Sequence, residues 1–203
     1  MSRLPRAVPA LLTACLLLAG CSDLSATGDK GYVSGDGQVT FLDPSERGDP
    51  VELAGEGLEG EPLDLADSRG TPVVVNVWGA WCVDCRIEMP DLLEARETLG
   101  DEAAFVGINV RDNSAAQAVR FAENVGIDYP SFYSSDGRAL LPFSGTIPPR
   151  AIPSTVVLDA QGRVAGSIIG RLPSALTLVD LVEDVAGAGN TGGSGAPGGA
   201  GDG

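Results

Sequence analysis

Residues 78–85 read Trp-Gly-Ala-Trp-Cys-Val-Asp-Cys and lie between two contrasting segments. Before them, residues 73–77 read Val-Val-Val-Asn-Val, a short apolar run rich in β-branched side chains that is typical of a buried strand. After them, residues 86–99 have the composition of a helix, and we expect Gly100 to cap its C-terminus. Two cysteines with two residues between them therefore lie where a buried strand gives way to a helix.

The position of Cys82 and Cys85 indicates their chemistry. At a helix N-terminus, unpaired N–H groups and the helix dipole stabilise a thiolate. We expect Cys82 to be the exposed nucleophile, and Cys85, one turn further, to be shielded and to resolve the mixed disulfide that Cys82 forms. A purely structural disulfide is the alternative, although so short a loop removes little entropy from the unfolded chain. With no histidine in the sequence, we expect no metal site and no cofactor.

A resemblance to known proteins extends beyond the cysteines. Trp-x-x-Trp-Cys-x-x-Cys after a valine-rich strand, with Pro90 five residues beyond Cys85, resembles thioredoxin. Residues 76–90, Asn-Val-Trp-Gly-Ala-Trp-Cys-x-x-Cys-Arg-x-Glu-Met-Pro, resemble the TlpA/ResA-like, membrane-tethered thiol-disulfide oxidoreductases, and the likeness runs from about residue 39 to about residue 185. It implies an α/β, thioredoxin-like fold: a central mixed β-sheet with helices on both faces, an N-terminal β-hairpin, and an inserted strand–helix segment.

The remaining elements follow from local patterns. Turn residues separate two β-branched runs at 39–42 and 51–53, where the resemblance places the N-terminal hairpin. Residues 129–145 are the expected insertion. The sequence further predicts a strand at 104–110, a helix from the capping box Ser114-x-x-Gln117 to Gly126, a hairpin of 155–158 with 164–169, and a last helix after Pro173 and Ser174.

The resemblance also implies roles for residues outside the cysteine pair. Glu88 matches a functional glutamate of ResA-like proteins, and it would exchange a proton with Cys85; a solvated acid of the first helical turns is the alternative. Asn76 stands where thioredoxins have a buried aspartate. Pro153 matches the cis-proline that faces the cysteines, which would leave the backbone of Ile152 free to pair with an extended substrate. Trp81 would shape the substrate surface, as would Trp78 unless it belongs to the core.

Asp84 departs from the resemblance, because relatives usually have proline directly before the second cysteine. Its charge should raise the pKa of Cys82, and no histidine is present to lower it. A less stable thiolate makes the dithiol a better electron donor. The alternative is that Asp84 is a first-turn acid without a redox role.

The two ends of the chain differ from its middle. Residues 1–20 combine Arg3 and Arg6 with an apolar run too short to span a bilayer, and end in Leu-Ala-Gly before Cys21. This resembles a lipoprotein signal peptide, in which Cys21 becomes the lipidated first residue; an ordinary signal peptide is the alternative. We interpret residues 21–37 as a flexible tether, 38–186 as the thioredoxin-like domain and 187–203 as a disordered Gly-rich tail.

These features predict an extracytoplasmic lipoprotein, anchored to the cell membrane, that reduces protein disulfides. The net charge of −15 argues against nucleic acid as a partner. From the resemblance come a CcdA/DsbD-like membrane electron donor and apocytochrome c as a candidate substrate during cytochrome c maturation. Two alternatives are a peroxide-reducing redoxin, whose Pro-x-x-x-Thr-x-x-Cys pattern is lacking before Cys82, and a redox-inert binding module, which the intact cysteine pair disfavours.

Overall fold

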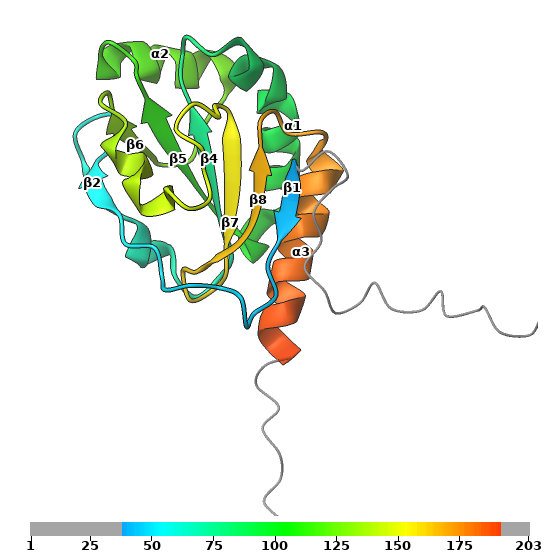
Figure 1. Cartoon of the computed structure of the whole chain (residues 1–203). Helices are drawn as coiled ribbons and strands as arrows, with labels where there is room; N and C mark the ends of the chain where they lie inside the picture. The colour runs from blue at the N-terminus through cyan, green and yellow to red at the C-terminus, as the bar shows by residue number, and fades with distance from the viewer. Residues whose placement is uncertain (1–37, 192–203) are drawn as a thin grey trace, which may run out of the picture. The chain divides into compact units, whose positions relative to one another are not determined.

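The computed structural model describes residues 38–191, which form a six-stranded mixed sheet flanked by helices (Figure 1). The strand order is β1-β8-β7-β4-β5-β6, and a separate pair joins β2 to β3. The strands are β1 Val39–Phe41, β2 Ala54–Glu56, β3 Pro62–Asp64, β4 Val73–Trp78, β5 Ala104–Val110, β6 Ser131–Ser134, β7 Ser154–Leu158 and β8 Val164–Ile169. The α-helices are α1 Val83–Leu99, α2 Ala115–Val125 and α3 Ala175–Thr191, and the 3₁₀ helices are η1 Leu65–Ser68, η2 Gly100–Glu102 and η3 Arg138–Phe143.

Strand β4 occupies the middle of the sheet, as its continuous apolar sequence predicts. All six of its residues are buried, and it pairs in parallel with β5 and antiparallel with β7. The register sets Val77 opposite both Ile108 and Ser154. The C-terminal ends of β4 and β5 and the N-terminal end of β7 therefore meet at one edge of the sheet, and this edge carries the cysteine loop.

Alternate residues of β4 build two cores. Val74 and Trp78 face α1, α2 and α3, whereas Val73, Val75 and Val77 face the opposite side. The second side is covered by η1, η3 and the chain that leads into them, through Leu65, Ala139 and Phe143 among others. The predicted sheet flanked by helices is confirmed, with all three α-helices on one face and the 3₁₀ helices η1 and η3 on the other.

The N-terminal hairpin exists, but its predicted residues are wrong. Strand β1 joins the main sheet by pairing with β8, Val39 opposite Ile168, because β8 would otherwise present an open edge of unpaired backbone groups. Residues 51–53 form no strand; Val51 only donates its N–H to the carbonyl of Gly162. The hairpin instead consists of β2 and β3, with Gly55 opposite Leu63.

The end of the domain also differs from the prediction. Helix α3 continues to Thr191, five residues past the predicted boundary at residue 186, so residues 187–191 are helical. Extending a formed helix fixes few dihedral angles for each new hydrogen bond, and Ala188 favours it. The predicted tail from 192 onward, the signal peptide, the tether and Cys21 lie outside the described residues.

The predicted insertion and the second helix are confirmed. The insertion consists of β6, which pairs in parallel with β5, followed by η3. Helix α2 begins as its capping pattern predicts, because the Ser114 side chain accepts from the N–H of Gln117 at 3.3 Å. It ends at Gly126, whose φ of 86° lies in the left-handed region. Within residues 38–191, no helix is both long and apolar enough to cross a membrane.

Candidate active site

Cys82 and Cys85 form a disulfide at the N-terminus of α1, with a sulfur–sulfur distance of 2.08 Å. Cys82 is the N-cap residue, and its sulfur accepts the N–H of Cys85 at 3.0 Å. This donor lies where the negative charge of a Cys82 thiolate would develop after reduction. Cys85 is completely buried, in agreement with the prediction that it is shielded. Cys82 is only 5% exposed, so the expectation of an exposed Cys82 is wrong for the disulfide form.

The side chain of Trp81 fixes the loop before the cysteines to the end of β5. Trp81 is 46% exposed, and its indole N–H donates to the carbonyl of Val110 at 3.0 Å. Gly79 permits this contact, since a Cβ there would lie 2.5 Å from the indole nitrogen of Trp81. Trp81 is therefore a fixed apolar surface beside Cys82. Trp78, by contrast, is fully buried and stacks on Phe121 with ring centroids 5.4 Å apart, so its alternative interpretation as core is confirmed.

Asp112 is a site residue that the sequence interpretation missed. Its carboxylate, 2% exposed, accepts the N–H of Ala80 at 3.0 Å and the amide of Asn109 at 2.7 Å. Asp112 is the second residue after β5. The residue between them, Arg111, has a φ of 59°, which turns the chain sharply. An acid directly after a buried strand that neighbours the cysteine strand was the available indication. Asp112 thus ties the end of β5 to the loop that carries Cys82.

Pro153 follows the one cis peptide bond among residues 38–191, so it is in the cis form that the resemblance implies. Its neighbour Ser154 lies opposite Val77, so the proline is at the cysteine edge of the sheet. The expectation that the Ile152 backbone is free is wrong for its N–H, which donates to the carbonyl of Arg150 at 3.1 Å. Pairing of this N–H with a substrate therefore requires that tight turn to open, and the role of Ile152 stays a prediction.

Glu88 is buried, with 1% of its surface exposed, so its interpretation as a solvated acid is wrong. One carboxylate oxygen accepts from the amide of Asn76 at 3.1 Å, and the other accepts from the N–H of Leu172 at 2.9 Å. Asn76 also donates to Thr155 at 3.3 Å. Glu88 lies one helical turn beyond Cys85 on the same side of α1, where it joins the helix to β4 and to the loop before α3.

The surroundings of Glu88 place its proton equilibrium near neutral pH. Burial raises the pKa of its carboxyl from 4.5 to about 7, against the opposing effect of the hydrogen bonds from Leu172 and Asn76, and the charge of Asp84 raises it further. A carboxyl with this pKa can both accept and release a proton at physiological pH. The proton-transfer role of Glu88 toward Cys85 stays a prediction that this burial and pKa support.

Asp84 is exposed in the first turn of α1, next to Cys85. Burial is the main cause of the raised pKa of Glu88, and the negative charge of Asp84 adds a smaller increase. Its effect on the thiolate of Cys82 stays a prediction. Among the described residues, no group of three or more histidine, cysteine or acidic side chains is arranged to hold a metal ion.

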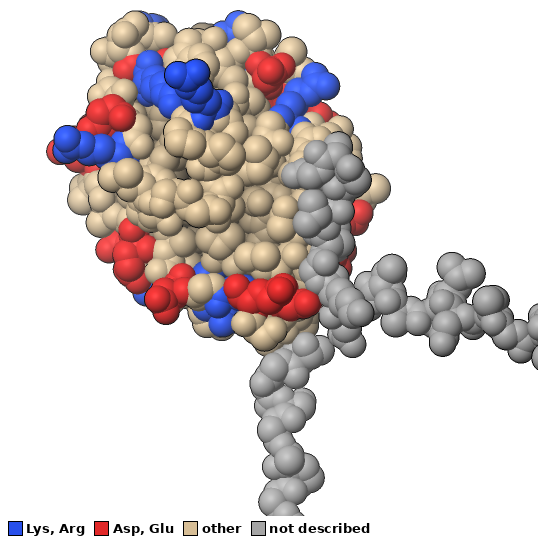
Figure 2. Space-filling view, viewed as in Figure 1, with Lys and Arg blue, Asp and Glu red and all other residues tan. Residues whose placement is uncertain are grey.

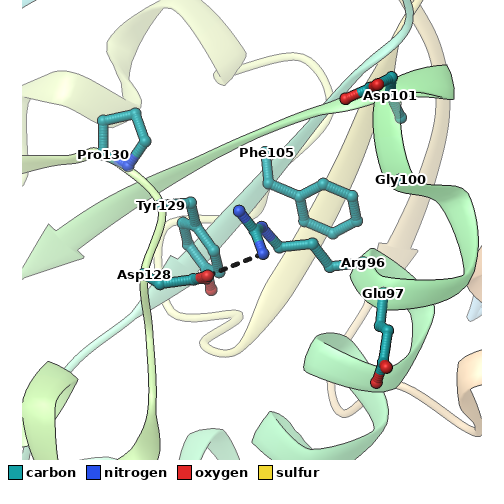
Figure 3. Close-up of a pocket in the computed structure, with 9 residues that line it drawn as sticks. Arg96, Glu97, Gly100, Asp101, Phe105, Asp128, Tyr129 and Pro130 are labelled. Atoms are coloured by element: carbon teal, nitrogen blue, oxygen red, sulfur yellow. Dashed lines mark hydrogen bonds and ion pairs between the residues drawn. The ribbon is translucent and has the colours of Figure 1, made fainter.

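A separate hollow lies at the other end of α1 (Figure 3). Figure 3 shows Arg96 reaching across it to Asp128, an ion pair of 2.9 Å, beside the ring of Tyr129. At a rise of about 1.5 Å per residue, roughly 20 Å of helix separates Arg96 from Cys82. The buried hydroxyl of Tyr129 donates to the sulfur of Met89 at 3.9 Å. This hollow backs onto the core and contributes no group to the cysteine site.

The family profile of Redoxin matches residues 46–183, the segment that contains the cysteine loop and every strand of the main sheet except β1. The chain belongs to the Redoxin family. Within this Redoxin chain, the match begins in the loop after β1 and ends inside α3, so it covers every element that positions Cys82, Cys85, Glu88 and Pro153.

Relatives of this Redoxin protein include the thiol:disulfide interchange protein DsbE of Pseudomonas aeruginosa, 34% identical over 141 residues that cover 64% of this chain and 73% of DsbE. The thiol-disulfide oxidoreductase ResA of Bacillus subtilis is 24% identical over 133 residues, covering 65% of this chain and 72% of ResA. Among solved structures, a DsbF homologue from Corynebacterium diphtheriae is 38% identical, with a TM-score of 0.68 over 75% of this chain and 96% of its own.

A secreted thiol-disulfide isomerase from Corynebacterium glutamicum is 32% identical, with the same TM-score of 0.68 over 76% of this chain and 98% of its own. These similarities confirm the thioredoxin-like fold. Together with the Cys82–Cys85 pair at the start of α1, they identify the chain as a thiol-disulfide oxidoreductase of the DsbE/ResA-like group.

Proposed function

We propose that this protein reduces protein disulfides outside the cytoplasm, with Cys82 as nucleophile, Cys85 as resolving thiol and Glu88 as proton acceptor. The observation that carries the proposal is the burial of Glu88 one turn behind Cys85, with a pKa of about 7. A disulfide with a purely structural role has no need of a titrating carboxyl buried at this position. The exposed indole of Trp81 and the cis-proline loop supply a surface on which a polypeptide can lie.

The reaction starts from the dithiol. The Cys82 thiolate attacks one sulfur of the substrate disulfide, and the other substrate sulfur leaves as a thiolate that takes up a proton from solvent. Cys85 then loses its proton to the Glu88 carboxylate and attacks the sulfur of Cys82. The mixed disulfide breaks, the second substrate sulfur leaves as a thiolate, and Cys82–Cys85 becomes a disulfide. The departing thiolate takes up a proton from solvent, and Glu88 returns its proton to solvent and is again a carboxylate. Two electrons pass from protein to substrate, which ends as a dithiol.

The direction of electron flow follows from the charges near Cys82. Asp84 adds a negative charge in the first turn of α1, and the sequence has no histidine to offset it. Both features disfavour the thiolate, and a dithiol with a less stable thiolate gives up its electrons more readily. We infer that the protein works as a reductant.

The site of action rests on the N-terminal sequence. We propose that cleavage before Cys21 and lipidation of its thiol anchor the protein to the outer side of the cell membrane, with residues 22–37 as a tether. Regeneration of the dithiol then requires an electron source in the membrane, and a CcdA/DsbD-like protein fits that role. Apocytochrome c, whose thiols must be reduced before haem attachment, is the candidate substrate.

Equilibration of the purified protein with glutathione buffers of graded potential tests this function. We expect the Cys82–Cys85 couple to have a lower reduction potential than the glutathione couple. In a separate assay, we expect the dithiol protein to reduce insulin disulfides once per molecule when no glutathione is present. Cys82→Ser is the matched inactive control. A protein that reduces hydrogen peroxide but not insulin would be the peroxide-reducing alternative, and one that reduces neither would be a binding module.

A further inference from the structure

Residues 38–191 hold ten arginines, of which five form an ion pair and five do not; one of the second five, Arg120, is exposed on α2. Arg47, Arg69, Arg96, Arg138 and Arg163 each pair with an acidic side chain. Within residues 38–191, four exposed arginines near the cysteine edge of the sheet form no ion pair. This set, called here the arginine arc, consists of Arg86, Arg111, Arg150 and Arg171.

Each member of the arginine arc is adjacent to a residue of the active site. Arg86 follows Cys85 in the first turn of α1. Arg111 follows Val110, whose carbonyl binds the indole of Trp81. The other two flank the remaining parts of the site: Arg150 precedes Ile152 and the cis-proline by a short turn, and Arg171 precedes Leu172, whose N–H binds Glu88.

Two members of the arc lie on loops that are joined to each other. The guanidinium of Arg111 donates to the carbonyl of Pro149, so the end of β5 and the chain before Arg150 are joined. Figure 2 shows a large group of blue side chains near the upper margin, the end toward which β4 and β5 run in Figure 1, whereas red side chains predominate along the lower margin. The positive charges therefore gather where the cysteine loop is.

Few acids offset this charge near the site. Asp84 is exposed there, whereas Asp112 is buried and turned inward onto Ala80, and Asp136 is paired with Arg138. Residues 43–67, by comparison, hold nine acidic side chains and one arginine. In physiological salt, charges further away than about 8 Å are largely screened. A partner at the cysteines therefore meets the arc more than it meets the net charge of −15.

Three large apolar side chains are exposed in the loop before Cys82 and in the first turns of α1. Trp81, Val83 and Ile87 are 46%, 69% and 50% exposed. Val83 lies between the cysteines, and Ile87 is one turn further along α1. None of the three has a part in the sulfur chemistry, so their exposure on one surface indicates contact with another molecule.

We propose that this face binds polypeptide segments in which the disulfide cysteine is flanked by acidic residues, an inference that rests on the proposed function. Trp81, Val83 and Ile87 contact the segment around the cysteine, and the arginine arc binds carboxylates on either side of it. Guanidinium groups suit this role because they are always charged and bind a carboxylate through two parallel hydrogen bonds. Exposed, unpaired arginines also accelerate encounter with an acidic partner.

Two disulfide-linked peptides test the preference. The residues immediately beside the cysteine are the same in both peptides. The positions further out carry Asp and Glu in one peptide and Lys in the other. We expect the dithiol protein to reduce the acidic peptide at least tenfold faster at low salt, with the ratio falling toward one in 0.5 M salt. The double substitution Arg111→Gln with Arg150→Gln should lower the acidic-to-lysine rate ratio about fivefold. Arg69→Gln, which removes the same kind of charge at the opposite end of the sheet, should leave the ratio unchanged.

A binding measurement separates this proposal from the proposed function. Fluorescence anisotropy of labelled, cysteine-free versions of both peptides reports docking on the oxidised protein without any sulfur chemistry. Tighter binding of the acidic peptide, weakened by the double substitution and not by Arg69→Gln, supports the docking face even if reduction fails. Equal or tighter binding of the lysine peptide, or equal effects of the double and control substitutions, overturns it even if both peptides are reduced.

Discussion

Glu88→Gln provides a quantitative test of the buried carboxyl. The folded protein holds the Glu88 proton up to a pKa of about 7, whereas the value without burial is 4.5. Below about pH 4.5 both folded and unfolded chains are protonated, and Glu88 adds no pH dependence. As pH rises from 4.5 to 7 the unfolded chain ionises first, so the free energy of unfolding of the wild type should fall.

The expected size follows from the difference between the two pKa values. That difference is about 2.5, and each pKa unit corresponds to about 1.4 kcal/mol. The wild type should therefore lose about 3 kcal/mol of stability, relative to Glu88→Gln, between pH 4 and pH 8. Glutamine places an N–H₂ group against the donors of Asn76 or Leu172, which adds a cost that does not vary with pH and so cancels in the comparison.

Guanidinium denaturation of both oxidised proteins at five pH values between 4 and 8 gives the required curves. Glu123→Gln, on the exposed side of α2, is the control for loss of a carboxylate. The difference in free energy of unfolding between this variant and the wild type should not change with pH. A flat difference for Glu88→Gln as well would show that Glu88 titrates normally and would remove the basis for its proton-transfer role. In thiol exchange, the wild-type rate should show an inflection near pH 7 that Glu88→Gln lacks.

Three further predictions concern other parts of the chain. Cys21→Ser should release the protein from membranes or block its processing, as fractionation and mass spectrometry would show; normal processing with unchanged membrane retention would contradict lipidation. Asp84→Asn should lower the pKa of the Cys82 thiol and raise the reduction potential, and Asp84→Pro should do the same; unchanged thiolate absorbance and glutathione equilibrium would leave Asp84 a surface acid. Asp112→Ala removes two hydrogen bonds to a buried carboxylate and should destabilise the fold by about 2–4 kcal/mol in denaturation, with slower insulin reduction; wild-type values would refute its role in holding the Ala80 loop.

The sequence predicted the elements that local pattern determines. For three elements, a few neighbouring residues are enough to predict the structure. They are the apolar run of β4, the capping Ser114 of α2 and the turn between β7 and β8. The site residues with a motif, Cys82, Cys85 and Pro153, were found for the same reason. In the structure Cys82 and Cys85 form a disulfide at the start of α1 and Pro153 has a cis peptide bond, but Cys82 is buried rather than exposed.

The features that the sequence did not reveal depend on distant partners. Residues 39–42 and 51–53 look alike as strands, and only the open edge of β8 determines that the first pairs and the second does not. The burial of Glu88 depends on Leu172, 84 positions away, and the carboxylate of Asp112 meets Ala80, 32 positions away. The sequence does not show which distant groups such a carboxylate contacts, because its burial is set by the packing of other elements.

Capture of the mixed disulfide is the most direct test of the central claim, that Cys82 attacks substrate disulfides and Cys85 resolves them. Cys85→Ser lacks the resolving thiol, so it should accumulate in cells in covalent, DTT-sensitive adducts through Cys82. Cys82→Ser, its matched control, should capture little, since Cys85 is completely buried. Mass spectrometry of the adducts identifies the partners: proteins with Cys-x-x-Cys-His haem-attachment sites or a membrane electron donor would support the cytochrome proposal. Absence of adducts with Cys85→Ser, or equal capture by both variants, would contradict the mechanism.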